Sequence, residues 1–490
     1  MSFYLPNAFS LILPVKKKIM EDEYDFGMIG LGVMGSNLLL NMADHGFSVI
    51  GFDTNAEKTK SLEASATKAT TVRGVNSLQE MIAKLKTPRK IMMLVPAGKP
   101  VDSVIASLKP LLQNGDIVID GGNSRYTDTL RRIQELREAG FHFMGVGISG
   151  GEEGARRGPS IMPGGDIQAY KEVEPILKAI AANVDGIPCV GYLGNNAAGH
   201  YVKMVHNGIE YAIMELISEC YDMMHNGLQL SNEELHRVFK SWDEGELKSY
   251  LVEITAAIFE KKDDRTGNDL VDMILDKAGA KGTGKWTSQD ALDLQTPIPT
   301  IDSAVMMRNL SSLIEQRQES NSIYKCSPEK IEMDKKQFID QLHDALYFSI
   351  LISYAQGLGM ISTASSELKM KIPLPEVVSV WRDGCIIRSA MLALFKNAYK
   401  NPDLQNILLD SSIARLLKKK QSAIQQVISI SALHNYPAAA MMASFNYFNA
   451  YCRKLLPTNL VQAQRDFFGA HTYERIDADG IFHTSWEAVS

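Results

Sequence analysis

A glycine-rich turn near the start of the chain constrains the fold more than any other feature. An apolar run at residues 26–29 leads into Gly30, Gly32 and Gly35, and a helical pattern follows. In this G-x-G-x-x-G spacing the first glycine allows a tight turn, the second lets the backbone approach a pyrophosphate, and the third lets the helix pack closely on the strand. The next apolar run ends at Asp53, about 20 residues on, where dinucleotide-binding folds carry an acidic residue. We therefore predict a strand, a helix and a second strand that bind a dinucleotide.

The charge beside the expected adenine ribose predicts which dinucleotide binds. The carboxylate of Asp53 can accept hydrogen bonds from the ribose hydroxyls, and it repels a 2′-phosphate. We therefore expect NAD to be preferred over NADP. The predicted cofactor-binding residues lie in the glycine turn and after later strands: Gly30, Gly32, Val33, Met34, Gly35, Asp53, Thr54, Asn55, Val95, Pro96, Ala97 and Asn123.

The rest of the chain divides into an alternating half and a helical half. Short apolar runs at 90–95, 116–120 and 141–145, separated by helical spacers, are typical of a parallel, doubly wound sheet. After Gly199 the hydrophobic period is helical and strand signals are absent. The predicted fold is an α/β Rossmann-like domain followed by a large all-α domain. The predicted ranges are a flexible extension at 1–24, a dinucleotide-binding domain at 25–198, a helical domain at 199–455 and a C-terminal tail at 456–490.

The helical half contains a faint internal repeat. The stretch that begins at His206 is echoed by the stretch that begins at His343, and each is followed by a tryptophan, Trp242 or Trp381. The separation is 36 residues in the first copy and 38 in the second. This pattern favours two related helical bundles packed as one domain over a solenoid.

Two glycine-rich loops are predicted after strands of the sheet, at 120–124 and 147–156. Ligands of open α/β folds bind at the carboxyl ends of the strands. Asn123 and Ser149 offer neutral donors and acceptors that suit sugar hydroxyls. The alternative is that both loops are only tight turns.

A polar stripe interrupts the apolar helix expected after Gly199. Lys203, His206, Asn207 and Glu210 follow the spacing i, i+3, i+4 and i+7, so they share one helical face. The lysine and the glutamate lie two turns apart, roughly 10 Å along the axis, which leaves room for a small substrate between them. The alternatives are a solvated stripe or a core histidine whose hydrogen bonds are satisfied.

Two further segments suggest binding functions. In the stretch 279–286, glycines surround Lys281 and Thr283, so backbone amides, a hydroxyl and an ammonium could cradle an anion. The tail carries Arg465 and His471 among aromatic residues. These tail residues could complete a site, or the tail could simply pack on its own subunit.

Composition excludes several classes of protein. The formal net charge is -6, with 45% hydrophobic and 22% charged residues, as in an ordinary globular enzyme and not a nucleic-acid-binding protein. Five widely spaced cysteines without a CxxC pattern argue against disulfides and structural zinc, and we expect no metal. The chain shows neither the roughly 18 uninterrupted apolar residues of a membrane span nor the order of a secretory signal, so we expect a cytoplasmic protein.

From Phe26 to Trp486 these motifs together resemble the 6-phosphogluconate dehydrogenase family, the decarboxylating enzymes of the pentose phosphate pathway. The resemblance rests on five segments in a fixed order: 120–124, 149–152, 203–211, 281–286 and 464–473. It implies oxidation of a phosphorylated sugar acid at C3 with NAD(P), followed by loss of CO₂ to give ribulose 5-phosphate.

The resemblance also implies roles for individual residues. Lys203 matches the family's general base and Glu210 its general acid. Positions that hold the sugar acid are matched by Asn123, Ser149, Gly150, Gly151, His206 and Asn207, and the phosphate positions by Tyr211, Lys281, Thr283 and Arg308. Arg465 and His471 match tail residues that the family donates to the neighbouring subunit, which implies a homodimer.

The chain departs from the family at the cofactor's 2′-phosphate. The family usually has Asn-Arg-Thr where this chain has Asp53-Thr54-Asn55, and often a lysine where it has Pro96. Both changes remove positive charge, although Lys58 and Lys60 could partly substitute. NADP remains the alternative that the family implies. The alternative functions are a dehydrogenase for an unphosphorylated β-hydroxyacid such as 3-hydroxyisobutyrate, and a non-catalytic dinucleotide sensor.

Overall fold

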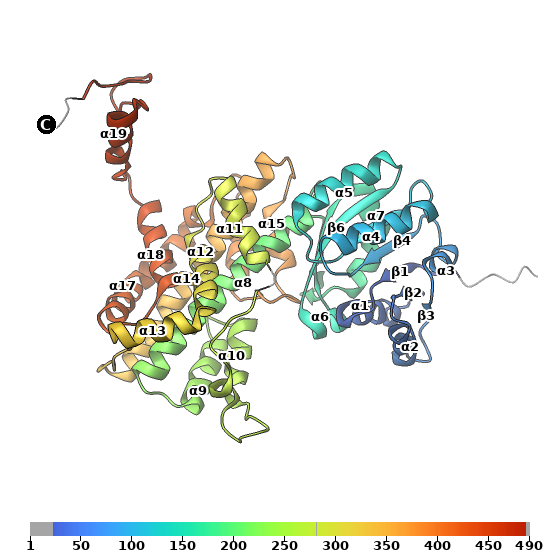
Figure 1. Ribbon diagram of the computed structural model, residues 1–490, viewed down its shortest axis with the longest axis horizontal. Coiled ribbons are helices and arrows are strands. Elements are labelled where there is room, and N and C mark those ends of the chain that lie inside the picture. The colour runs from blue at the N-terminus through green and yellow to red at the C-terminus, as the bar shows by residue number, and fades with distance from the viewer. Residues whose placement is uncertain (1–22, 281, 487–490) are drawn as a thin grey trace, which may run out of the picture. The chain divides into compact units, whose positions relative to one another are not determined.

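The computed structural model of the protein describes residues 23–280 and 282–486 (Figure 1). It divides into two compact units. The first unit comprises the described residues up to Lys203 together with 369–385, and the second comprises those of 204–368 and 386–486. Helix α8 (Ala198–Asp222) therefore begins in the first unit and continues into the second. Most of the predicted flexible extension lies outside the described residues, but Tyr24 is buried and pairs with Leu85.

A seven-stranded sheet forms the centre of the first unit. Its strands lie in the order β3-β2-β1-β4-β5-β6-β7. They are β1 (Phe26–Ile29), β2 (Val49–Phe52), β3 (Val72–Val75), β4 (Lys90–Met93), β5 (Ile117–Asp120), β6 (His142–Ser149) and β7 (Ser160–Gly165). Neighbouring strands from β3 to β6 are parallel, as predicted, whereas β7 pairs antiparallel with β6. The predicted parallel sheet therefore needs this correction at one edge.

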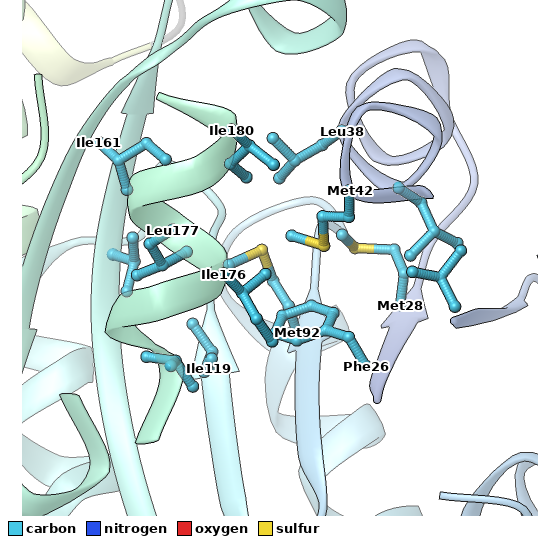
Figure 2. Packing of buried hydrophobic residues seen from close by; sticks show 14 of the residues in the cluster. Phe26, Met28, Leu38, Met42, Met92, Ile119, Ile161, Ile176, Leu177 and Ile180 are labelled. Carbon is cyan, nitrogen blue, oxygen red and sulfur yellow. The ribbon is translucent and has the colours of Figure 1, made fainter. Parts of the chain in front are cut away.

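Helices cover both faces of the sheet. They are α1 (Val33–Asp44), α2 (Ala56–Ser65), α3 (Leu78–Ala83), α4 (Lys99–Leu108), α5 (Tyr126–Glu138), α6 (Gly151–Arg157) and α7 (Ile167–Ile180). Alternate strand residues point to opposite faces. Met28 and Met92 pack against α1 and α7 on one face (Figure 2), whereas Ile29 and Met93 pack against α3 and α4 on the other. The predicted doubly wound Rossmann-like architecture is confirmed.

The second unit is built from helices, as the period predicted. Besides most of α8 they are α9 (Asn232–Asp243), α10 (Tyr250–Glu260), α11 (Thr283–Asp293), α12 (Pro299–Ser311), α13 (Ile314–Tyr324), α14 (Lys335–Glu367), α16 (Leu392–Ala398), α17 (Ser411–Leu433), α18 (Ala439–Tyr451) and α19 (Thr458–Gly469). The short helix α15 (Leu374–Val380) belongs to the segment assigned to the first unit. Trp381 of the second repeat copy follows α15, so that copy does not form a bundle confined to the second unit.

The longest helix, α14, is a core element of the second unit. By length and composition it is apolar enough to cross a membrane, but 89% of its most apolar window is buried inside the protein. It packs against α17 and α18. Its apolar character is therefore explained by burial in the helical core.

A buried carboxyl group joins α8 to α18. The Glu219 side chain accepts hydrogen bonds from the backbone N–H groups of Ala440 and Met441, at 2.6 and 3.0 Å. These N–H groups lie in the first turn of α18, which has no side-chain cap of its own. Burial raises the pKa of Glu219 to about 8, an effect that the two N–H donors only partly oppose. Glu215, one turn earlier, has its pKa raised by burial to about 7.

The Glu219 carboxyl predicts a specific dependence of stability on pH. Its pKa of about 8 in the folded protein exceeds its ordinary value of 4.5, so the folded state binds this proton more tightly than the unfolded state. The stabilisation is complete below about pH 4.5 and is lost as the pH rises to about 8. The free energy of unfolding of the wild type should therefore fall between pH 5 and pH 8, as measured by urea denaturation. In Glu219→Gln, which has no carboxyl group to titrate at this position, the fall should be smaller by about 2–4 kcal/mol.

The matched control is Glu233→Gln, which removes an exposed carboxylate paired with Arg237 on α9. Its pH profile should follow that of the wild type. Equal slopes for the wild type and Glu219→Gln would contradict the assigned pKa.

Candidate active site

The glycine turn has the geometry that a pyrophosphate site requires. Gly30 has φ +94°, and a Cβ there would lie 2.5 Å from the carbonyl oxygen of Leu94. A Cβ at Gly35 would collide with the carbonyl oxygen of Gly30, whereas one at Gly32 would meet nothing within 4 Å. The first and third glycines thus permit close packing, and the second leaves open space at the start of α1. The first-turn N–H groups of α1 lack intrahelical partners and face no capping side chain, so the turn fits an anionic diphosphate.

Asp53 places a negative charge beside this turn. Its carboxylate accepts hydrogen bonds from the N–H groups of Leu31, at 2.8 Å, and Asn55, at 2.9 Å. Lys58 lies 3.3 Å from the same carboxylate. Burial alone raises the pKa of Asp53, but the two N–H donors and the Lys58 ammonium outweigh it and bring the pKa below its ordinary value. Asp53 is therefore ionised at neutral pH.

The other predicted cofactor residues lie around the same turn or at the surface near it. Val95 follows β4, and its side chain would be 3.1 Å from a Cβ placed at Gly30. Pro96 and Ala97 are exposed. Thr54 is also exposed, and Asn55 caps α2 by accepting the N–H of Glu57. The structure thus brings Val95 to the glycine turn, between the ends of β1 and β4, which are neighbours in the sheet.

A buried network holds the loop that carries Asn123. Asp120 accepts hydrogen bonds from the N–H of Gly122, at 3.0 Å, and from the Ser124 hydroxyl, at 2.6 Å. The buried guanidinium of Arg132 lies 3.4 Å from the Asp120 carboxylate and donates to Asp102 at 2.8 Å. Asn123 itself is exposed. The loop is therefore fixed from beneath and presents one amide side chain, which a simple tight turn would not require.

His200 ties this loop to the first turn of α8. Its Nε2 lies 3.0 Å from the carbonyl oxygen of Asp120, and its Nδ1 lies 2.7 Å from the Thr129 hydroxyl. Burial lowers the pKa of His200, although the Asp120 charge opposes the shift, so the ring is neutral. A neutral ring with its proton on Nε2 donates to the carbonyl and accepts from the hydroxyl. Sequence analysis missed His200, Arg132 and Thr129 because no local spacing distinguishes them.

Glycines allow α8 to approach the sheet at Lys203. A Cβ at Gly147 of β6 would collide with the Lys203 side chain, and a Cβ at Gly199 would collide with the carbonyl oxygens of Gly145 and Met162. Lys203 is 6% exposed. The close approach sets Lys203 against β6 two residues before Ser149, the last residue of that strand. The lysine therefore lies at the carboxyl edge of the sheet, where the glycine turn also lies.

The segment 147–156, predicted as a loop, is mostly regular structure. Strand β6 continues to Ser149 and α6 begins at Gly151, so Gly150 alone separates them. Gly150 has φ +122° and Gly151 has φ +62°, conformations that favour glycine. The prediction failed because glycines at 145 and 147 serve close packing within a strand, not a turn.

The four polar residues of α8 are not a solvated stripe. His206 is fully buried, and its Nδ1 lies 3.1 Å from the side-chain oxygen of Asn207 and 3.8 Å from the Glu210 carboxylate. The Glu210 side chain is 21% exposed. With Lys203, these residues occupy one face of a single helix. The solvated-stripe alternative is therefore wrong.

Three of the residues matched to the phosphate site lie together in the second unit. The Arg308 guanidinium stacks on the Tyr211 ring at 3.4 Å, and a Cβ at Gly284 would lie 2.6 Å from the same ring. Thr283 begins α11 next to Gly284. Arg308 also donates to the carbonyl oxygen of Gly279 at 3.1 Å. A guanidinium, a phenol and a helix N-terminus thus converge. Lys281 lies outside the described residues.

Arg465 and His471 lie in the tail. Arg465 is exposed on α19 and donates to Gln462 at 3.1 Å, and the His471 ring packs edge-on against Phe468. In the described residues their contacts are with other parts of the tail.

One side-chain cluster resembles a metal site. Glu246, His343 and Asp344 lie close enough together to hold an ion. The Lys420 ammonium, however, lies 2.7 Å from both carboxylates and supplies the opposing charge.

Comparisons with known proteins agree over nearly the whole chain. Residues 25–194 match the family described as the NAD binding domain of 6-phosphogluconate dehydrogenase, and residues 199–486 match its C-terminal domain. A relative from Bacillus subtilis, named NADP(+)-dependent, decarboxylating 6-phosphogluconate dehydrogenase, is 50% identical over 95% of this chain and 99% of its own. A decarboxylating relative from Synechococcus elongatus is 49% identical over 94% and 99%.

A solved structure is similar throughout as well. It is the Plasmodium falciparum 6-phosphogluconate dehydrogenase, described in its apo form and in complex with NADP+ and with 6-phosphogluconate. It is 44% identical, has a TM-score of 0.92, and the match covers 94% of this chain and 100% of the other. The chain therefore belongs to the 6-phosphogluconate dehydrogenase family.

Proposed function

We propose that the protein oxidises and decarboxylates 6-phospho-D-gluconate to D-ribulose 5-phosphate and CO₂, with reduction of NAD(P). The observation that carries this proposal is the single face of α8 that bears Lys203, His206 and Glu210. The next residue, Tyr211, lies under the Arg308 guanidinium, which suits a phosphate. The relatives that match nearly the full chain are named for the same reaction.

The substrate would be gripped by groups matched to its parts. Asn123, Ser149, Gly150, Gly151, His206 and Asn207 would hold the sugar acid, and Tyr211, Lys281, Thr283 and Arg308 the phosphate. Amide and hydroxyl side chains suit the hydroxyl groups because each both donates and accepts. The Arg308 fork suits phosphate oxygens.

Lys203 would act first as a base and then as an acid. As a neutral amine at the buried edge of the sheet, it can take the proton of the 3-hydroxyl. When bound, a nicotinamide cofactor would supply the acceptor for the hydride that leaves C3. The resulting β-keto acid loses CO₂ because the electrons of the breaking bond pass into the C3 carbonyl. The protonated Lys203 stabilises the negative oxygen that develops there.

Glu210 would complete the reaction. The enediol left by decarboxylation needs a proton on C1 of the product, which was C2 of the substrate. Glu210 lies two helical turns from Lys203, so it reaches the substrate from the other end. Its distance of 3.8 Å from His206 Nδ1 gives it a partner that can stabilise its charge after the proton is donated.

Two substitutions test the separate roles of Lys203 and Glu210. Lys203→Met should lower kcat by about 10²–10⁴-fold while leaving cofactor affinity nearly unchanged, because the base for oxidation is lost. Glu210→Gln should still form reduced cofactor rapidly in the first turnover, because oxidation precedes protonation. Its steady-state rate should be lower than that of the wild type. Stopped-flow absorbance of the reduced nicotinamide separates the two steps.

The control is Lys178→Met, which removes an exposed lysine that pairs with Glu174 on α7. This variant should behave as the wild type. Near-normal turnover in Lys203→Met would refute the mechanism. If Glu210→Gln slowed the first turnover and the steady state equally, Glu210 would not be the general acid.

The alternatives are not favoured. An enzyme for an unphosphorylated β-hydroxyacid would have no use for Arg308 stacked on Tyr211 or for Arg465. A silent sensor would not need both Lys203 and Glu210 on one face of α8. Formation of reduced cofactor with 6-phosphogluconate, but not with 3-hydroxyisobutyrate, separates all three functions.

We further propose that NAD is the preferred cofactor. The Bacillus subtilis relative is named NADP(+)-dependent, and the Plasmodium falciparum structure includes NADP+. In this chain, however, an ionised Asp53 lies beside the glycine turn and Thr54 stands in place of the family's arginine. The two lysines that could compensate are each paired with a carboxylate: Lys58 with Asp53 and Lys60 with Glu57. A 2′-phosphate would meet net repulsion there.

Comparison of kcat/KM for NAD and NADP tests the cofactor proposal. The wild type should favour NAD, and Asp53→Asn/Thr54→Arg should shift the ratio toward NADP by about tenfold or more, because one repulsive charge is removed and one attractive charge is added. Glu135→Gln removes an exposed carboxylate of α5 that pairs with Lys109, and it should leave the ratio almost unchanged. A wild-type preference for NADP would refute the role given to Asp53.

We also propose a homodimer in which the tail completes the active site of the partner subunit. The tail exposes several large apolar side chains, which favours a covered surface: Leu460, Val461, Phe467, Phe468, Ile476 and Ile481. A second copy of the chain is the proposed occupant because Arg465 and His471 match residues that the family donates in this way. We place the enzyme in the cytoplasm, which suits five cysteines that form no disulfide in the described part of the chain.

Mixing two inactive variants tests the shared site. At 6-phosphogluconate concentrations below the wild-type KM, Lys203→Met and Arg465→Ala subunits should each be nearly inactive, but a heterodimer would contain one site with both residues intact. Random reassortment should therefore restore about a quarter of the wild-type activity. Mixing Lys203→Met with Glu210→Gln, both changed on α8, should restore much less. Equal recovery in the two mixtures, or none in the first, would refute the exchange of tails.

A further inference from the structure

The tail is organised around one carboxylate that the proposed mechanism does not use. Asp466 is fully buried, although it lies in a segment whose other side chains are largely exposed. One of its oxygens accepts hydrogen bonds from the Thr472 N–H, at 2.9 Å, and His483 Nδ1, at 2.8 Å. The other accepts from the Thr484 N–H, at 3.1 Å, and Trp486 Nε1, at 2.9 Å. Four donors from two later stretches of chain thus meet on Asp466.

These bonds fold the end of the chain back onto α19. Tyr473 and Phe482 exchange backbone hydrogen bonds as an antiparallel bridge, and the Tyr473 hydroxyl bonds to Thr484 at 2.6 Å. The Trp486 ring lies 5.9 Å from that of Phe467. The hydrogen bonds from His483 and the other three donors lower the pKa of Asp466 against the opposing effect of its burial, so the acceptor is the carboxylate. The tail is therefore a folded clip with a polar centre, not an extended strand.

The same carboxylate fixes the turn that presents His471. Its neighbours Ala470 and Thr472 both have positive φ, 49° and 61°, which non-glycine residues adopt only when other contacts hold them. Ala470 donates its N–H to the Asp466 carbonyl at 2.9 Å, and Gln462 donates to the Thr472 carbonyl at 2.6 Å. Both strained residues are thus held by Asp466 or its helix.

Gly469 lets the ring of His471 fold back. A Cβ at Gly469 would lie 2.6 Å from that ring, which packs edge-on against Phe468. Arg465, directly before Asp466, is held on the same helix by Gln462. The two residues matched to the substrate site therefore flank a single organising centre.

We propose that Asp466 is a positioning residue that holds Arg465 and His471 in a preformed arrangement before the tail docks on a second copy of the chain. The inference rests on the proposed function of these two residues. Preorganisation matters because a segment that must order on docking loses part of its binding free energy to that ordering. A clip built on charge-assisted hydrogen bonds avoids that cost without needing an apolar core.

The test compares Asp466→Asn with Asp477→Asn in the full-length protein. The amide in Asp466→Asn would turn its NH₂ toward two of the four donors. Asp477→Asn removes a carboxylate from the same tail, but that carboxylate pairs only with the exposed Arg475 in the described contacts. Hydrogen exchange of the Thr472 and Thr484 amides should be at least about tenfold faster in Asp466→Asn and unchanged in Asp477→Asn.

Steady-state kinetics with 6-phosphogluconate give the second readout. Asp466→Asn should raise KM for the substrate about tenfold or more with kcat nearly unchanged and the KM for the cofactor unaltered, because binding groups are misplaced but the reacting groups are not. A merely structural defect would lower the active fraction, and so kcat, at constant KM. That second pattern, or wild-type exchange rates in Asp466→Asn, would overturn the proposal. If the wild type itself failed to turn over 6-phosphogluconate, the proposed function would fall, while the exchange rates would still decide whether Asp466 organises the tail.

Discussion

The close approach of α8 to β6 is the contact on which the candidate active site depends. Gly147 and Gly199 lack the Cβ atoms that would keep the helix and the strand apart. Inserting a methyl group into such a contact typically costs about 1–3 kcal/mol and shifts the backbone. Lys203 owes its position at the edge of the sheet to this contact, and the rest of the polar face of α8 follows from the helical period.

Buried polar groups hold this arrangement in place. His200 joins the first turn of α8 to the Asp120 loop, and Arg132 joins that loop to Asp102. Buried ion pairs contribute little net stability, because desolvation offsets most of their attraction. Their value here is geometric, since each has one arrangement that satisfies all its hydrogen bonds. Asp466 does in the tail what Asp120 does in the loop: one carboxylate gathers several donors and fixes the residues beside it.

Local patterns predicted the features that depend on local spacing. The turn at Gly30, the strands β1, β2, β4 and β5, and the helical second half all follow from hydrophobic period and glycine placement. The strands at the two edges of the sheet, β3 and β7, were harder to predict from the sequence. β3 contains Arg73 and a glycine, and β7 contains Pro163 and two glycines, so neither has the apolar run of a central strand. The stacking of Arg308 on Tyr211 and the bonds of His200 join distant parts of the chain, and no spacing rule encodes them.

We propose that one face of α8 presents a base and an acid to opposite ends of the same substrate. The decisive test is a crystal structure with 6-phosphogluconate and the oxidised cofactor. We expect Lys203 Nζ within about 3 Å of the C3 hydroxyl oxygen, the Glu210 carboxyl beside C2, and the phosphate against Arg308. A complex in which either side chain contacted no part of the sugar acid would contradict it.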